Sequence, residues 1–413
     1  MRLTDNIRII GKNFSYLSIL KLFSIATKFF LFAYLLKILG ADTYGQLVWS
    51  DSIIQYLIIF INFGFNVYAA TLVIKFQKRR LKLNQLFSSI IQIKTILFVA
   101  SIIIIFLLTS FNLKIGNVSD LLYLLILTGI GEILFPIWYF QGIEKLKPAT
   151  LIVLSSRIII VILTIIFVKD HTDVLLYASI SVIGTTIMGV IGIWFVINKY
   201  QISFKYQKWI RLFYYIKDAS MFFLGRFMAM AFTSISIFIV GYYLTMESVT
   251  VFDWSLKLIA VAVIPFEMLT QALFPTISRT KDKRLLLKSI WITLGLSFLI
   301  TVGVLSFANE LLRIIGIDNI SYAKLSVQLL AILIPFIAVS FLLGISSLVA
   351  FGFNREYNRT LIISSSFFLL GVFTLVSLSE VTLFNVILLR IFADILLMAL
   401  RLRYVLKLNI LRF

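Results

Sequence analysis

The sequence is organised as twelve long apolar blocks, and the loops that join them alternate between basic loops and loops almost without Lys or Arg. One alternate set of loops, together with the two chain ends, carries 26 basic residues. The other set carries four, which are Lys37, Lys114, Lys169 and Arg313. Because basic residues collect in cytoplasmic loops, this alternation predicts twelve membrane crossings with both chain ends in the cytoplasm.

The apolar blocks approach or exceed the length that a membrane-spanning helix requires. Hydrophobic residues make up 61% of the 413 residues, well above the roughly 45–50% of soluble domains. A helix needs about 20 apolar residues to cross a hydrocarbon core of about 30 Å. The predicted spans are 14–38, 46–74, 88–110, 121–141, 148–168, 174–197, 213–243, 250–275, 286–307, 323–352, 360–378 and 382–403.

A basic segment in the middle of the chain divides the spans into two groups of six. We therefore predict an all-α membrane protein with about twelve transmembrane helices, arranged as two six-helix lobes around a central cavity. The expected parts are an N-terminal lobe over 1–197, an amphiphilic cytoplasmic linker over 198–212 and a C-terminal lobe over 213–413. The linker fits either a basic segment that lies on the inner leaflet or a plain charged connector.

Composition excludes several other kinds of protein. The formal net charge of +20 suggests nucleic-acid binding, but the cations are confined to alternate loops, so we expect no nucleic-acid partner. The chain has no cysteine, which excludes disulfides and thiolate metal sites. Its single histidine, His171, falls in an outer loop, which argues against histidine-based catalysis. We predict no metal, no cofactor and no cleavable signal peptide, because the first block is too long for one.

Apart from six charged residues at the very ends of the predicted spans, thirteen Asp, Glu, Lys or Arg residues fall inside them. Lys21, Lys94 and Lys324 lie near helix ends, where we expect their long side chains to reach water. Asp51 and Asp253 lie near the outer ends of their helices and can reach water in the same way. Eight residues lie deeper: Lys28, Glu132, Arg157, Arg226, Lys257, Glu267, Arg390 and Asp394.

Exposure of eight central charges to lipid would cost about 20–28 kcal/mol, more than the roughly 5–15 kcal/mol by which a typical fold is stable. The deep charges must therefore face one another or a hydrated cavity. Two interpretations remain open. An excess of cations favours an anionic passenger, bound by Lys28, Arg157, Arg226, Lys257 and Arg390. Alternatively, the charges form ion pairs that hold helices together, because Asp253–Lys257 and Arg390–Asp394 are each four residues apart on one helical face.

Three prolines lie close to deep carboxylates or interrupt a predicted span. Pro136 follows Glu132, Pro265 precedes Glu267, and Pro335 falls inside the tenth span. A proline frees a backbone carbonyl and permits a kink, and broken helices commonly line transport paths. The candidates for binding a coupling proton or Na⁺ are Asp51, Glu132, Glu267 and Asp394, each of which fits equally well as a plain salt-bridge partner.

Four segments, in the same order along the chain, resemble those of O-antigen and related polysaccharide flippases of the Wzx type. Residues 136–147 match the pattern P-x-W-[FY]-F-Q-G-x-E-x-x-K, and residues 272–278 match A-L-F-P-x-[IL]-S. Residues 39–45 and 62–65 match the first outer loop and the second helix of that family. The residues of the first pattern are Pro136, Trp138, Phe140, Gln141, Gly142 and Glu144.

The resemblance implies membership of the multidrug/oligosaccharidyl-lipid/polysaccharide exporter superfamily, whose members have two six-helix lobes. It further implies a flippase that moves undecaprenyl-diphosphate-linked oligosaccharides from the inner to the outer leaflet of the bacterial inner membrane. A polysaccharide polymerase and a chain-length regulator are the partners that the resemblance implies, beside the lipid-linked oligosaccharide and the membrane lipids. A cation-rich cleft suits this substrate, because fixed charges replace water around a diphosphate.

Three other functions have sequence features that this chain can be checked for. A major-facilitator carrier would show a Gly-x-x-x-Asp-Arg-x-Gly-Arg-Arg pattern in the second-to-third loop, and residues 75–80 lack it. A drug exporter of the same superfamily would be expected to carry more acid in its cavity. A membrane glycosyltransferase or polymerase would need a sizeable domain or large outer loop for its chemistry, and the predicted outer loops are short. We therefore predict a transporter and not an enzyme.

Overall fold

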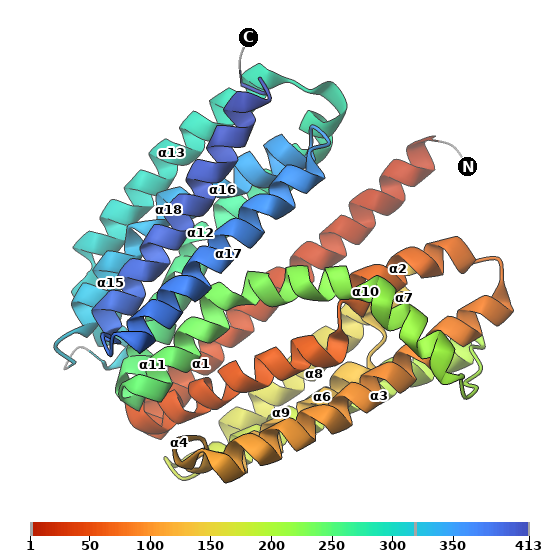
Figure 1. Cartoon of the computed structure of the whole chain (residues 1–413), viewed down its shortest axis with the longest axis horizontal. Helices are drawn as coiled ribbons and strands as arrows, with labels where there is room; N and C mark the ends of the chain where they lie inside the picture. The colour runs from red at the N-terminus through yellow and green to blue at the C-terminus, as the bar shows by residue number, and fades with distance from the viewer. Residues whose placement is uncertain (1–2, 318–319, 412–413) are drawn as a thin grey trace. The chain divides into compact units, whose positions relative to one another are not determined.

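The computed structural model describes residues 3–317 and 320–411, and within these ranges it is helical with no strand (Figure 1). Side chains at 3–22, 24, 25, 28 and 231 lie outside the description. The chain forms two compact units, Met1–Phe227 and Met228–Phe413, so the division falls inside one helix, α10.

The first unit is built from ten helices or parts of helices among the residues described. They are α1 (Leu3–Asn62), α2 (Phe65–Phe76), α3 (Arg80–Phe111), α4 (Leu113–Gly116), α5 (Ser119–Leu125), α6 (Thr128–Leu134), α7 (Ile137–Gly142), α8 (Leu146–Phe167), α9 (Val174–Tyr200) and the first part of α10 (Trp209–Met230). Within this unit, α6 and α8 pack against α9, and α2 packs against α7.

The second unit contains eight further helices and two π-helical segments in its described part. They are η1 (Ala231–Ile235), α11 (Ser236–Tyr243), α12 (Met246–Thr280), α13 (Lys283–Ser306), α14 (Ala308–Ile315), α15 (Ala323–Ala331), α16 (Leu333–Phe341), η2 (Leu342–Val349), α17 (Asn354–Ser377) and α18 (Leu383–Lys407). Here α17 and α16 pack against α18, and α13 packs against α16.

Eleven helical stretches of the described chain are long and apolar enough to cross a membrane. The first of them, 29–76, covers parts of two predicted spans and is 48 residues long. A straight helix of that length would measure about 72 Å, more than twice the hydrocarbon core. The stretch is not one straight helix, because the backbone of Gly40 is not helical (φ 76°, ψ 167°) and divides α1 into two. The expected architecture of about twelve helices is confirmed in this form.

The fourth predicted span is not one helix but three short ones, α5, α6 and α7. The break between α6 and α7 falls at Phe135 and Pro136, where proline cannot continue the hydrogen-bond pattern. The tenth span is similarly divided at Ile332, three residues before Pro335. In contrast, α12 runs without interruption through Pro265 and Pro275.

Small residues let α6 and α9 approach closely. A Cβ atom built on Gly131 would lie 2.3 Å from the Thr185 carbonyl oxygen, and one on Gly189 would lie 2.8 Å from the Gly131 carbonyl oxygen. Small residues at helix contacts are typical of membrane proteins, where close backbone packing replaces the hydrophobic effect. Conversely, many large apolar side chains point outward, including Phe111, Leu113 and Phe373, as expected of surfaces that face lipid.

Candidate functional site

Two of the predicted deep charges form an ion pair on α18. Arg390 Nε lies 2.6 Å from Asp394 Oδ2, and the two side chains are 12% and 8% exposed. The spacing of four residues places them on one face of the helix, so this predicted pair is confirmed. A buried carboxylate of this kind requires a partner, because an isolated charge in a low-dielectric interior is costly.

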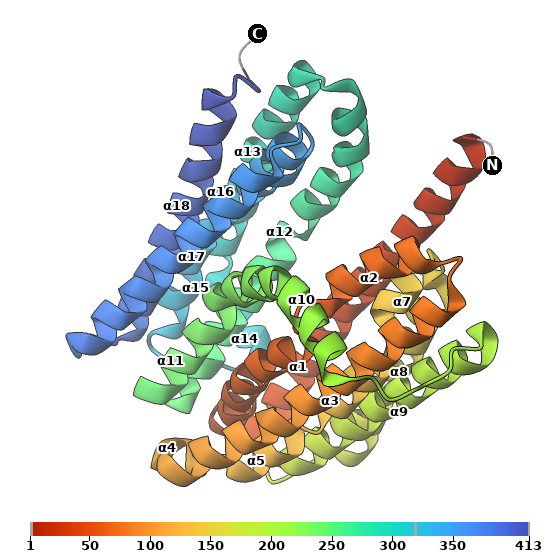
Figure 2. The same cartoon turned by 45° about the vertical axis from the view of Figure 1, so that its right-hand side comes forward.

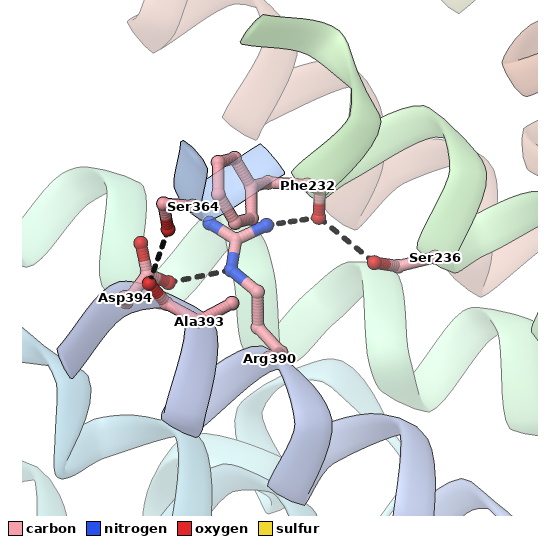
Figure 3. A network of polar contacts seen from close by, with 6 residues as sticks. All are labelled: Phe232, Ser236, Ser364, Arg390, Ala393 and Asp394. Atoms are coloured by element: carbon pink, nitrogen blue, oxygen red, sulfur yellow. Dashed lines mark hydrogen bonds and ion pairs between the residues drawn. The ribbon is translucent and has the colours of Figure 1, made fainter. Parts of the chain in front are cut away.

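The same arginine also binds the π-helical segment η1 (Figure 3). Arg390 Nη1 donates to the main-chain carbonyl of Phe232, and its guanidinium lies 5.0 Å from the centre of the Phe232 ring. The Ser236 hydroxyl donates to the same carbonyl at 2.8 Å. From α17, Ser364 donates to the carbonyl of Ala393 at 2.6 Å, which ties α17 to the same part of α18. Arg390 therefore connects α18 to an irregular turn in the preceding part of the unit.

The second predicted pair, Asp253 and Lys257, forms an ion pair on α12. Asp253 is almost fully buried, whereas Lys257 is about one quarter exposed. Further along the same helix, Glu267 is half-buried and accepts a hydrogen bond from Gln271 Nε2 at 3.3 Å. These carboxylates are held by polar neighbours within α12 itself.

A polar cluster in the first unit joins three helices. Lys94 Nζ, on α3, donates to Asn62 Oδ1 at 2.7 Å and to the Glu132 carbonyl oxygen at 3.1 Å. Asn62 Nδ2, at the end of α1, donates to Glu132 Oε2, on α6, at 3.1 Å. One amide side chain therefore bridges a cation and a carboxylate. The cluster lies at the end of α1, because Phe63 and Gly64, which follow Asn62, have positive φ and end the helix.

The prediction that Lys94 extends to water is wrong, since its side chain is 0% exposed. The predicted span began at residue 88, but α3 begins at Arg80. Lys94 therefore lies about four helical turns from the start of α3. It is buried between α3, α1 and α6 and depends on Asn62 and Glu132 for its polar contacts. Asn62 was missed as a site residue because its partners lie far away in the sequence.

Two other predicted residues lie elsewhere in the first unit, Asp51 on α1 and Arg157 on α8. Asp51 is exposed and accepts a hydrogen bond from Gln55 Nε2 at 3.2 Å, while Arg157 is half-buried. Arg226 is exposed on α10. The predicted residue Lys28 lies outside the described side chains.

The pattern at 136–147 forms a packing centre. Trp138 and Phe140, on α7, are both fully buried. The Trp138 ring lies 5.5 Å from that of Phe87 on α3, and the Phe140 ring lies 5.9 Å from that of Phe195 on α9. Stacked and tilted aromatic pairs of this kind contribute about 0.5–1.5 kcal/mol each beyond their buried area. Pro136 is buried at the start of α7.

The remaining residues of the pattern, Gln141, Gly142 and Glu144, lie where α7 packs against α2 and turns into α8. A Cβ atom on Gly142 would lie 2.5 Å from the Val73 Cβ atom and 2.8 Å from the Ala70 carbonyl oxygen, so only glycine allows α7 to approach α2. Gln77 on the chain after α2 donates to the Gly142 carbonyl at 3.1 Å. Gln141 is half-buried, and Glu144 is exposed with φ 57° in the turn before α8. Most of the pattern thus holds helices together.

Among the residues described, no group of three or more His, Asp or Glu side chains is placed to hold a metal ion. Residues 10–281 match the family described as polysaccharide biosynthesis protein, which covers more than half of the chain. The chain belongs to the polysaccharide biosynthesis protein family.

Two relatives share most of their length with the chain. A protein of Escherichia coli (strain K12) is 24% identical over 376 residues, which cover 89% of this chain and 90% of the relative. A protein of Shigella dysenteriae is 27% identical over 257 residues, which cover 61% and 63% of the two chains. Both carry the name "Putative O-antigen transporter". The expected resemblance to polysaccharide transporters is therefore confirmed.

Solved structures confirm the transporter fold of this polysaccharide biosynthesis protein family member. The lipid II flippase MurJ, in an inward closed conformation, matches with a TM-score of 0.75 and 17% identity, over 95% of this chain and 89% of MurJ. An inward-facing multidrug resistance MATE family transporter of the MOP superfamily matches with a TM-score of 0.71 and 13% identity, over 93% and 94% of the two chains. The chain is thus a multi-pass membrane protein with the fold of transporters and flippases rather than of enzymes.

Proposed function

We propose that this protein moves undecaprenyl-diphosphate-linked oligosaccharides from the inner to the outer leaflet of the bacterial inner membrane. The observation that carries the proposal is the match to an O-antigen transporter relative over about nine tenths of both chains. The fold shared with a lipid II flippase supports it, because lipid II is itself named as a flipped lipid in that structure. Transport would proceed by alternating access between two lobes.

The deep cations support an anionic lipid headgroup as the passenger. Within the described residues, no ion pair involves Arg157 or Arg226, in contrast to Lys257 and Arg390. An arginine presents a planar fork of donors that suits phosphate oxygens. We propose Arg157 and Arg226 as the principal groups that attract the diphosphate, with Lys28, Lys257 and Arg390 adding to the positive field.

We also propose that transport is coupled to a proton or Na⁺ bound by a carboxylate. Asp51, Glu132, Glu267 and Asp394 are the candidates, and Glu132 is favoured. Its carboxylate contacts a neutral amide, Asn62, rather than an arginine, and its main-chain carbonyl binds a buried lysine. Asp394 is instead held directly by Arg390. A carboxylate that is bridged to its cation through an amide can change protonation without leaving a guanidinium unpaired.

Cells that lack the protein provide the test. Loss of a flippase should leave lipid-linked repeat units on the cytoplasmic face and remove the surface glycan, and re-expression should restore it. Loss of a polymerase would instead leave single exported repeat units at the surface.

A drug-type exporter is the competing function, since a multidrug transporter shares the fold. Unchanged surface glycan together with increased drug sensitivity would favour that function.

We also propose that the protein associates with a polymerase and a chain-length regulator. Crosslinking in the same cells would test this association.

A further inference from the structure

An extended segment, residues 201–208, lies along α3 before α10 begins (Figure 2). The Ser203 amide donates to Asn84 Oδ1 at 3.3 Å, the Lys205 amide to Ser88 Oγ at 3.0 Å and the Gln207 amide to Gln92 Oε1 at 3.2 Å. Alternate residues of the segment thus bind side chains on successive turns of α3.

The distance between every second residue of the segment matches the distance between every fourth residue of α3. Two residues of extended chain advance about 6.6 Å, and four residues of helix advance about 6 Å. Asn84 Nδ2 also donates to Ser203 Oγ at 2.7 Å, and Arg80 donates to the Gln201 carbonyl at 3.4 Å. Ile202 and Gln207 are buried against the unit. The segment is therefore fixed to α3 along its length and is not a free tether.

With residues 201–208 attached to α3, the face of residues 199–214 that points away from α3 consists of aromatic and basic side chains. Tyr206 is 86% exposed and Trp209 is 60% exposed. Phe204, Ile210, Phe213 and Tyr214 are also exposed large side chains. Lys199, Lys205, Lys208 and Lys217 are exposed among them. Between 199 and 218 the sequence has five cations and one acid, Asp218, which accepts a hydrogen bond from Tyr68 at 2.8 Å.

The position of this face along the chain indicates its surroundings. The candidate membrane span 209–243 begins directly after the segment, which favours a place for residues 201–208 at the boundary between membrane and water. Tyrosine and tryptophan are enriched at that boundary, and basic side chains there bind anionic headgroups. A soluble acidic protein would match the charge but not the exposed aromatic residues at this depth.

We propose that the exposed face of residues 199–214 is a binding surface for anionic phospholipid headgroups, held in register by hydrogen bonds to α3. Lys205 and Lys208 bind the headgroups, and Phe204, Tyr206 and Trp209 insert between them. The proposal holds whichever molecule the protein transports. Each basic residue at a membrane surface contributes about 1 kcal/mol toward anionic headgroups, a factor of about five, so removal of two should lower the local enrichment about 25-fold.

The absence of cysteine in the sequence makes a direct test practicable, since one introduced thiol is unique. The full-length Tyr206→Cys variant would carry a fluorophore in phosphatidylcholine nanodiscs that contain a minor fraction of nitroxide-labelled phosphatidylglycerol or, separately, nitroxide-labelled phosphatidylcholine. We expect stronger quenching by the labelled phosphatidylglycerol. A matched control carries the fluorophore at Leu113→Cys, which is 91% exposed at the start of α4, just beyond the far end of α3, and should show no preference.

The Lys205→Gln/Lys208→Gln substitutions in the Tyr206→Cys background should abolish the preference without loss of folded protein, because both side chains are exposed. Equal quenching by the two lipids at position 206 would overturn the proposal, as would a preference that survives loss of both lysines. Quenching by neither lipid, with protection of the label by added cytosolic protein instead, would assign the face to a protein partner and also overturn it.

Discussion

Arg390 and Arg401 lie eleven residues apart on α18, and each binds a main-chain carbonyl at or beside a π-helical segment. Eleven residues make about three helical turns, so the two side chains share one face. Arg390 binds the Phe232 carbonyl within η1. Arg401 donates to the Ser340 carbonyl at 2.8 Å, two residues before η2, and its guanidinium lies 4.8 Å from the Tyr357 ring. α18 thus holds both irregular segments of the second unit.

The first prediction concerns the buried pair Arg390 and Asp394. Arg390→Met should lower the free energy of unfolding by about 3–5 kcal/mol, because it leaves a buried carboxylate without its cation. The double variant Arg390→Met/Asp394→Asn should recover part of this loss. Thermal unfolding in detergent measures both. A double variant no more stable than the single variant would show that the pair is not the source of the effect.

The second prediction tests whether the pattern at 136–147 is structural. Gly142→Ala should destabilise the first unit by about 1–3 kcal/mol, because the added Cβ would overlap Val73 and the Ala70 carbonyl. The matched control is Gly295→Ala on α13, where no atom lies within 4 Å of the added Cβ. That helix-interior change should be neutral or stabilise by up to about 1 kcal/mol. Equal behaviour of the two variants in thermal unfolding would contradict the packing role.

The third prediction concerns the cluster of Asn62, Lys94 and Glu132. Lys94→Met should destabilise the protein by about 1–3 kcal/mol, because Asn62 Oδ1 and the Glu132 carbonyl lose their donor. Lys324→Met is the control, since Lys324 is exposed and its loss should change stability by less than about 0.5 kcal/mol. Similar losses for both lysines in thermal unfolding would mean that the buried contacts of Lys94 contribute nothing.

The fourth prediction separates a structural from a coupling role for Glu132. Addition of Glu132→Gln to Lys94→Met should restore part of the lost stability, because it removes the carboxylate that the lysine no longer balances, although the two acceptors of Lys94 stay without their donor. If Glu132 binds the coupling ion, transport should remain lost in this double variant. Thermal unfolding measures the stability of each variant, and the amount of surface glycan measures its transport. Together the two measurements separate a structural role of Glu132 from a coupling role. Recovery of both stability and transport would show that Glu132 is only a structural partner of Lys94.

Local patterns in the sequence predicted the features that depend on local structure. The apolar blocks predicted the helices, and a spacing of four residues predicted the pairs Asp253–Lys257 and Arg390–Asp394. Contacts between distant segments were not predictable in this way. Asn62 and Glu132 are 70 positions apart, and Arg390 and Phe232 are 158 positions apart. Nor did hydropathy indicate that α3 begins at Arg80, because its first two turns mix polar and apolar residues and lie outside the apolar block.

The most direct test of the central claim is a flipping assay in reconstituted vesicles. Fluorescent undecaprenyl-diphosphate oligosaccharide would be placed in one leaflet, and its arrival in the other leaflet measured by chemical quenching. Arg157→Ala and Arg226→Ala should each slow flipping about tenfold or more, since a charge-assisted hydrogen bond contributes about 1.5–3 kcal/mol. Arg284→Ala, on an exposed turn, should flip at the unaltered rate. Equal rates in all four proteins, or no flipping above protein-free vesicles, would contradict the account.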